Sequence, residues 1–210
     1  MLTRLLVAVA AMVAVVAASN FLVQFPVEAQ LGGINLADLL TWGAFTYPVA
    51  FLVNDLTNRT LGPARARLVV VSGFAVAVIV SIWLATPRIA IASGTAFLVA
   101  QLLDISVFDR LRRSSWWKAP IASTLLGSVI DTVLFFGLAF APALISLDTW
   151  FGREDGSLGF GAPLLGVGPE VPLWVSLAAG DFLVKLLVAA LLLAPYKLLR
   201  DRLGDRFATA

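Results

Sequence analysis

The chain has 210 residues, of which 60% are hydrophobic and only 13% are charged. Soluble domains carry roughly 25% charged residues, so this composition, with a mean hydropathy of +0.95, excludes an ordinary soluble protein. A net charge of +2 is too small to indicate nucleic-acid binding. The chain has no cysteine and no histidine, which excludes thiolate nucleophiles, disulfides and the commonest proton shuttle and metal ligand. We therefore expect no metal or other cofactor, and proton chemistry would need carboxylates, a lysine or a tyrosine.

Six apolar stretches are long enough to cross, as helices, a hydrocarbon core roughly 30 Å thick. Because these stretches are unbroken and do not alternate, they favour helices over barrel strands. The sequence thus predicts an all-α integral membrane protein with six transmembrane helices in a single transmembrane domain, residues 1–210. The expected spans are residues 5–24, 36–57, 68–86, 89–108, 120–146 and 172–199, and residues 147–171 form an extracytoplasmic loop.

The first span also has features of a cleavable signal peptide, since Arg4 precedes an apolar run with small residues at 16–19. The apolar run continues through Val23, beyond the usual length of such a peptide. We therefore expect a retained helix.

Basic residues alternate between the connections, and this pattern sets the orientation. The loops that follow the first, third and fifth spans hold only Arg88 and Arg153. The other connections and the two ends hold Arg4, Arg59, Arg65, Arg67, Arg110, Arg112, Arg113, Lys118, Lys197, Arg200, Arg202 and Arg206. Because Lys and Arg accumulate on the cytoplasmic side, we expect a multi-pass protein of the cytoplasmic (inner) membrane with both termini in the cytoplasm.

Polar and ionisable side chains occur inside the expected spans. A charge near the bilayer centre costs at least about 2.5–3.5 kcal/mol, so such groups usually face a cavity or a partner. Spacings of three and four residues place each set on one helix face. The sets are Asn54, Asp55 and Asn58; Gln101 and Asp104; Thr124, Gly127, Ser128 and Asp131; and Asp181 with Lys185.

Structural roles compete with functional ones at several of these positions. Ser, Thr and Gly on the fifth span also suit helix–helix contacts. Asp181 and Lys185 could form a structural ion pair or take part in ion coupling, and Asp55 could pair with Arg59. Pro48 should kink the second span, and freed carbonyls are tolerated beside a cavity. Phe45 or Tyr47 could stack there on a planar ligand, although aromatics more often serve packing.

Five motifs together resemble one family, the queuosine precursor transporters, a branch of the vitamin-uptake-transporter-like membrane proteins. The motifs are TWGAFTYP at 41–48, NDLTNR at 54–59, AQLLDISVF at 100–108, STLLGSVIDT at 123–132, and the Asp181…Lys185 helix. They cover roughly residues 20–185. The long Gly/Pro-rich loop 147–171 departs from the family, in which this connection is shorter.

The resemblance implies a six-helix transporter, and no enzyme, that imports 7-cyano- or 7-aminomethyl-7-deazaguanine, most simply as a secondary carrier. A carboxylate can accept from the N1–H and the exocyclic amine of such a base, while an amide meets its carbonyl. We expect the base edge to meet Asp104 with Gln101, and Asp131 with Asn54 or Asp55. One of Asp55, Asp104 and Asp131 could bind a coupling proton. The candidate substrate-binding residues are Asn20, Phe45, Tyr47, Asn54, Asp55, Gln101, Asp104, Thr124 and Asp131.

The sequence leaves two other classes of protein open. A substrate-binding membrane subunit of a multi-component vitamin importer would take its ATPases from partner chains, because this chain has no phosphate-binding loop. An intramembrane aspartyl-type enzyme needs two facing aspartates, but Ala178 and Ala179 stand where its Gly-x-Gly-Asp signature would begin. The expected partners are a small planar base and membrane lipid, with no nucleic acid. Small residues on the third and fifth spans would permit a homodimer.

Overall fold

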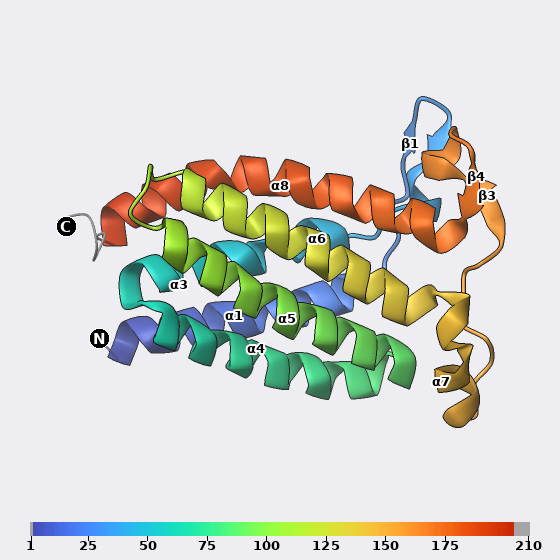
Figure 1. The fold of residues 1–210 in the computed structure, drawn as a ribbon, viewed down its shortest axis with the longest axis horizontal. Helices are drawn as coiled ribbons and strands as arrows, with labels where there is room; N and C mark the ends of the chain where they lie inside the picture. The colour runs from blue at the N-terminus through green and yellow to red at the C-terminus, as the bar shows by residue number, and fades with distance from the viewer. Residues whose placement is uncertain (1, 204–210) are drawn as a thin grey trace.

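The computed structural model describes residues 2–203 and shows a bundle of long helices with small strands at one end (Figure 1). The start of α1 and the end of α8 lie at the opposite end, where Arg4 Nη1 donates to the carbonyl oxygen of Leu203 at 3.2 Å. The α-helices are α1 Leu2–Leu22, α2 Gly43–Thr46, α3 Val49–Leu61, α4 Pro63–Leu84, α5 Pro87–Leu111, α6 Lys118–Phe140, α7 Ile145–Trp150 and α8 Leu173–Leu203. The 3-10 turns are η1 Leu36–Asp38, η2 Pro142–Leu144 and η3 Leu164–Gly166. The strands are β1 Gln30–Leu31, β2 Ile34–Asn35, β3 Gly161–Pro163 and β4 Glu170–Pro172.

Five helices of the described chain are long and apolar enough to cross a membrane: α1, α4, α5, α6 and α8. Their outward faces carry large apolar side chains, such as Leu6, Val71, Val133 and Leu191. Their buried faces include many polar side chains. This distribution confirms an all-α integral membrane protein, because lipid accepts an apolar exterior that water would not.

The expected second span differs from a continuous helix over residues 36–57. Residues 36–42 form η1 and irregular chain, and the helix that follows is interrupted after Thr46. Pro48 has no N–H, and Ala50 N–H and Phe51 N–H instead donate to the carbonyls of Tyr47 and Pro48 at 2.9 and 3.1 Å. The backbone of Tyr47 and Pro48 keeps right-handed helical angles. The break expected at Pro48 is therefore present, and α3 is left with 13 residues.

Helix ends follow local sequence signals. Gly62 has a φ of +92°, which favours glycine, and lets α4 begin directly after α3 with Pro63 in its first turn. The side chain of Thr86 caps α5 by accepting from Ile89 N–H. Ala141 is extended because it precedes Pro142, so α6 ends at Phe140, six residues before the expected end of the span.

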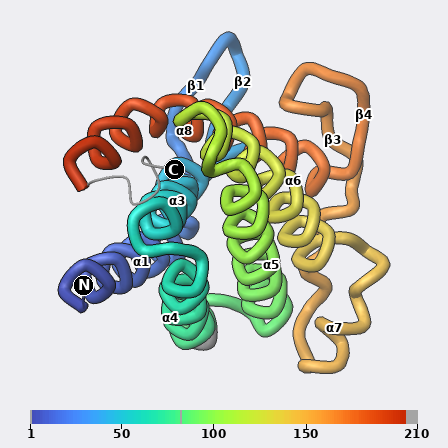
Figure 2. Tube along the Cα trace, turned by 60° about the vertical axis from the view of Figure 1, so that its left-hand side comes forward, coloured from blue at the N-terminus to red at the C-terminus, as the bar shows by residue number. Residues whose placement is uncertain are grey.

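The short helix α3 lies at the centre of the bundle and contacts all five long helices (Figure 2). Beside it, Met12 and Val16 of α1 pack with Val69 of α4 and Phe97 of α5 in the main apolar core. Gly73 permits close packing of α4 there, since an added Cβ would lie 2.7 Å from Met12 Cγ. Side chains on α3 can therefore reach each of the five long helices.

A buried ion pair ties the strand-bearing end of the bundle together. Arg88, at the start of α5, donates from Nη1 to Asp148 Oδ2 of α7 at 2.5 Å. Its Nε and Nη2 donate to the carbonyls of Leu138 and Ala141, at 2.9 and 2.5 Å, at the end of α6. Both side chains are buried. We call Arg88 and Asp148 the loop clamp, because they fix the segment after α6 against α5.

Candidate functional site

One stripe of α3 and of the turn before it carries the polar side chains at the centre of the bundle. Tyr47, Phe51, Asn54, Asp55 and Asn58 are three or four residues apart and therefore share a face. The four within α3 are buried. This stripe contacts two separate groups of polar residues, one near each end.

The first group, which we call the amide–carboxyl cluster, comprises Asn54, Asp55 and Asn58 of α3, Gln101 and Asp104 of α5, and Ser123 of α6. Asn54 Nδ2 donates to Asp104 Oδ2 at 2.9 Å and to the backbone oxygen of Gln101 at 3.2 Å. Asn58 Nδ2 donates to the carbonyl of Ile105 at 3.1 Å. These bonds hold α3 and α5 side by side through buried amides.

Two carboxyl groups meet within this cluster. Asp55 of α3 and Asp104 of α5 lie close enough to interact electrostatically. Ser123 Oγ of α6 is 3.3 Å from Asp55 Oδ1 and donates to it. Asp55 is 2% exposed and Asp104 is fully buried. Three helices thus bring two acids together inside the membrane.

Several atoms of the amide–carboxyl cluster are left without hydrogen-bond partners. Both side-chain amide atoms of Gln101, Asp104 Oδ1, Asn54 Oδ1 and Asn58 Oδ1 make no hydrogen bond within the described part of the chain. These four side chains are 0% exposed. A buried polar group left unsatisfied costs roughly 1–3 kcal/mol. Such a concentration of free donors and acceptors indicates a site that a polar ligand completes.

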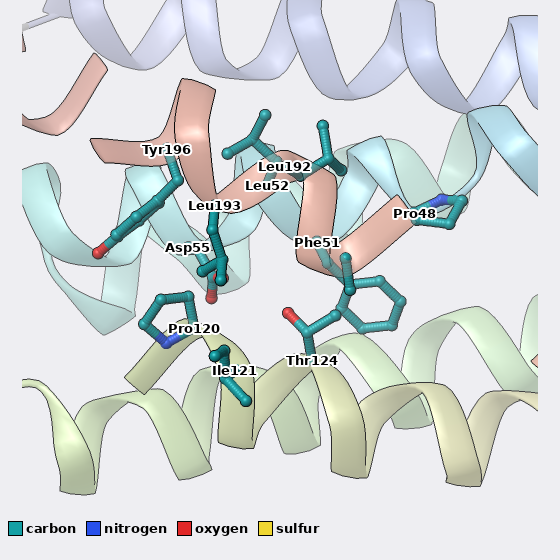
Figure 3. Close-up of a pocket in the computed structure, with 11 residues that line it drawn as sticks. Pro48, Phe51, Leu52, Asp55, Pro120, Ile121, Thr124, Leu192, Leu193 and Tyr196 are labelled. Atoms are coloured by element: carbon teal, nitrogen blue, oxygen red, sulfur yellow. The ribbon is translucent and has the colours of Figure 1, made fainter. Parts of the chain in front are cut away.

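A small pocket lies next to this cluster, between α3, α6 and α8 (Figure 3). Asp55, Phe51 and Thr124 line it together with Pro120 and Tyr196. Figure 3 shows Thr124 beside the ring of Phe51 and Asp55 one turn further along α3. The pocket therefore gives the carboxyl pair an apolar, aromatic neighbour of the kind that small-molecule sites combine with a few polar groups.

The second group, which we call the Lys185 cluster, comprises Tyr47, Asp131, Thr132, Asp181 and Lys185. Lys185 Nζ donates to Asp131 Oδ2 at 2.7 Å, to Thr132 Oγ1 at 3.2 Å and to Asp181 Oδ2. Tyr47 OH donates to Asp131 Oδ1 at 2.7 Å, and Thr132 Oγ1 is 3.1 Å from Asp181 Oδ2. All three ammonium hydrogens of Lys185 are thereby used. Unlike the first cluster, this one is largely self-satisfied.

Phe51 separates the two clusters along α3. Its side chain is 1% exposed and makes an edge contact with the ring of Tyr47, with centroids 6.2 Å apart. It packs against Gly127 of α6, where an added Cβ would lie 2.6 Å from Phe51 Cε1. The glycine of the expected small-residue stripe is therefore needed to admit this ring.

The structure brings only some of the expected site residues together. Asn54, Asp55, Gln101 and Asp104 meet in the amide–carboxyl cluster, and Thr124 lines the pocket beside Asp55. Asp131, which was expected to meet the base edge together with Asn54 or Asp55, bonds to Tyr47 and Lys185 in the other cluster.

Two expected site residues lie elsewhere. Asn20 bonds to the carbonyl of Val16 on its own helix and lies 3.5 Å from Ser81 of α4. Phe45 packs against Trp42, with ring centroids 5.8 Å apart. Within residues 2–203, neither side chain makes a hydrogen bond or a ring contact with either cluster.

Three residues of the site were not among those expected. Asn58 follows Asn54 by one turn, and Ser123 precedes Thr124, so helical spacing could have included both. Tyr196 lies in a long apolar helix, and no sequence pattern marks it; its hydroxyl accepts from Arg59 Nε at 3.2 Å. It enters the site only because α8 packs beside α3.

Comparison with known proteins identifies the family. Residues 41–86 and 80–199 match the family described as "putative vitamin uptake transporter". The queuosine precursor transporter of Escherichia coli K12 is 38% identical over 159 residues, which cover 65% of this chain and 69% of that protein. The "probable queuosine precursor transporter" of Haemophilus influenzae is 37% identical over 173 residues, which cover 70% and 72%. No solved structure matches the chain significantly. The chain therefore belongs to the vitamin uptake transporter family, and it is a multi-pass membrane transporter and not an enzyme.

Proposed function

We propose that this chain imports 7-deazaguanine precursors of queuosine across the inner membrane as a secondary carrier. The names of the two relatives support this substrate class. The amide–carboxyl cluster supports it chemically, because it presents free donors and acceptors in a fully buried place. The observation that carries the proposal is the unpaired amide of Gln101 beside the unpaired oxygen of Asp104, three residues further along α5.

The two side chains complement one edge of the base. A 7-deazaguanine presents an N1–H, an exocyclic amine and a carbonyl on its pairing edge. Asp104 can accept from the N1–H and the amine, and Gln101 Nε2 can donate to the carbonyl. A site built for such hydrogen bonds rejects analogues that lack them, because its buried groups are then left unpaired. The unpaired hydrogen-bonding groups of the cluster would therefore pair with those of the base.

The proposal includes six membrane crossings, with α2 and α3 forming the second. Residues 43–61 have a helical length of about 28 Å, close to the thickness of the hydrocarbon core. An even number of crossings agrees with the start of α1 and the end of α8 lying at one end of the bundle (Figure 1). Most of the basic residues lie at that same end, in the start of α1, the α3–α4 and α5–α6 connections and the end of α8, which favours a cytoplasmic location for both termini.

A homodimer is not required by this proposal. The glycines Gly73 of α4 and Gly127 of α6, which would permit close association of two copies, pack inside the chain against Met12 and Phe51. The exposed apolar side chains of the long helices are of the kind that contact lipid.

Binding to the purified protein in detergent tests the proposal. The probes are 7-cyano-7-deazaguanine, 7-aminomethyl-7-deazaguanine, guanine and biotin, read as a rise in unfolding temperature. We expect a shift with a deazaguanine that is lost in Asp104→Asn and kept in Asp201→Asn, a matched change at an exposed carboxylate. A shift with biotin alone, or none with either deazaguanine, would reject the substrate class.

A further inference from the structure

The proximity of Asp55 and Asp104 presents a charge problem that the cluster does not solve. Two ionised carboxylates that share a site repel each other, and burial away from water strengthens that repulsion. Here the acids come from α3 and α5, both are at least 98% buried, and each lies within the electrostatic reach of the other. Their repulsion must be relieved by a neighbouring positive charge or by a proton.

The neighbouring groups leave one position open. Ser123 donates to Asp55 Oδ1 and Asn54 donates to Asp104 Oδ2. Asp104 Oδ1 has no hydrogen-bond partner among the described residues. This buried acceptor lacks a donor although a second buried acid belongs to the same cluster. The simplest completion is a single proton on the pair.

The charged and titratable groups around the pair do not remove this need. Arg59 lies one turn further along α3 and contributes one positive charge for the two acids. It also donates to Tyr196 of α8, which faces the pair from that helix. The helix α6 contributes the neutral hydroxyl of Ser123, and α5 contributes Asp104 itself. Two carboxylates and one guanidinium would carry a net charge of −1, which a single proton neutralises.

We propose that Asp55 and Asp104 share one proton and that this proton is carried together with the base. The second half of this statement rests on the proposed function. The proton lies between the two carboxyl groups, next to the free Oδ1 of Asp104, and no covalent bond of the base changes. Asp104 keeps acceptor positions for the base, since a carboxylate offers about four lone-pair sites.

Binding of the base and of the proton would reinforce each other. When the base enters, it displaces water and leaves the carboxyl pair in a drier environment, where two negative charges are least tolerable. A proton on Asp55 leaves a single carboxylate on Asp104 to accept from the base. Binding of the base therefore raises the affinity of the site for the proton, and binding of the proton raises its affinity for the base. This mutual increase in affinity is the thermodynamic requirement for symport.

Infrared spectroscopy tests the shared proton without any ligand. At neutral pH we expect the absorption of a protonated carboxyl group in the wild-type protein and in Asp201→Asn. The band should be absent in Asp55→Asn and in Asp104→Asn, because an amide beside the remaining carboxylate supplies the donor. A wild-type protein without the band, or a band that persists in both variants, would overturn the proposal.

The pH dependence of binding tests the coupling. The probe is 7-cyano-7-deazaguanine, whose substituent carries no ionisable amine. Uptake of one proton on binding weakens affinity by up to about tenfold per pH unit above the titration of the pair, since the proton must then be taken from an increasingly dilute pool. We expect this slope in the wild type and in Asp201→Asn, and pH-independent binding in Asp55→Asn.

Transport in vesicles completes the test. An imposed inward proton gradient should drive accumulation of labelled base by the wild type and by Asp201→Asn, whereas it should drive none by Asp55→Asn, whatever exchange activity that variant retains. Wild-type binding that is independent of pH, or gradient-driven accumulation by Asp55→Asn, would overturn the coupling. If no deazaguanine binds at all, the proposed substrate is rejected, and the infrared result still decides whether the proton is shared.

Discussion

Lys185 of α8 donates to Asp131 of α6 across 2.7 Å, and both side chains are buried. The expected pair of Lys185 with Asp181, one turn apart on the same helix, is also present. Because Tyr47 donates to the other oxygen of Asp131, the Lys185 cluster joins α6 and α8 to the break between α2 and α3. A local pair predicted on one helix is therefore part of a contact between three segments.

Replacing Lys185 should destabilise the protein strongly. Lys185→Met leaves Asp131 and Asp181 buried without their shared donor, and breaking a buried ion pair from one side typically costs about 3–5 kcal/mol. The measurement is the unfolding free energy in detergent. Lys197→Met, at an exposed position on the same helix, should change it by less than about 0.5 kcal/mol. Equal effects of the two substitutions would contradict a stabilising role for the cluster.

The five long helices could be predicted because apolar length alone decides them. The segment 36–42 could not, since its apolar residues pack in irregular backbone. The carbonyl of Leu39 and the side chain of Leu40 lie 3.4 and 3.5 Å from where a Cβ on Gly180 of α8 would be. Hydropathy shows that such residues avoid water, but it does not show which backbone conformation they adopt. Pro48, in contrast, predicted a kink in the second span, and the helix is interrupted at that position.

The site was predictable along each helix but not between helices. Spacing placed Asp55 and Asn58 on one face and Gln101 and Asp104 on another. Which faces meet depends on how the helices rotate against each other, which local spacing does not encode. Spacing therefore gave no sign that Asp131 of α6 contacts Lys185 of α8. Arg88 and Asp148, 60 positions apart, gave no local signal of the loop clamp at all.

Gly127→Ala should destabilise the bundle by about 1–3 kcal/mol, the usual cost of overpacking. The new methyl group would lie 2.6 Å from Phe51 Cε1, and the fully buried ring has little room to move. Gly137→Ala on the same helix is the matched control, because nothing lies within 4 Å of its added Cβ. Thermal unfolding in detergent should show a loss only for Gly127→Ala. A second substitution, Phe51→Leu, should recover part of it.

The loop clamp should protect the segment after α6 from proteolysis. Arg88→Met removes the donor to Asp148 and to two carbonyls at the end of α6, so this segment should open more often. Limited digestion with trypsin should then cut after the exposed Arg153 several times faster than in the wild type. Arg202→Met, an exposed change elsewhere, should leave that rate unaltered. An unchanged rate in Arg88→Met would show that other contacts hold the loop.

Single cysteines can test the proposed orientation, because the natural chain contains none. Ser114→Cys lies in the exposed connection between α5 and α6, and Asp155→Cys lies in the exposed loop after α7. A membrane-impermeant maleimide added to intact cells with a permeabilised outer membrane should label Asp155→Cys. It should label Ser114→Cys only after the inner membrane is opened. The reverse pattern would place both termini outside, and labelling of both in intact cells would reject the six-crossing topology.

Gln101→Leu should separate binding from stability. The wild-type amide is fully buried with both polar atoms unpaired, so an apolar side chain of similar size should leave the unfolding free energy unchanged or raise it by about 1–3 kcal/mol. Affinity for 7-cyano-7-deazaguanine should fall at least about tenfold, because the carbonyl of the base loses its donor. Ser106→Ala, whose hydroxyl bonds only to the carbonyl of Leu102 on the same helix, should change neither quantity appreciably. A Gln101→Leu protein that binds normally would move the base away from Gln101, whereas one that loses stability would show that the amide is satisfied in the empty protein.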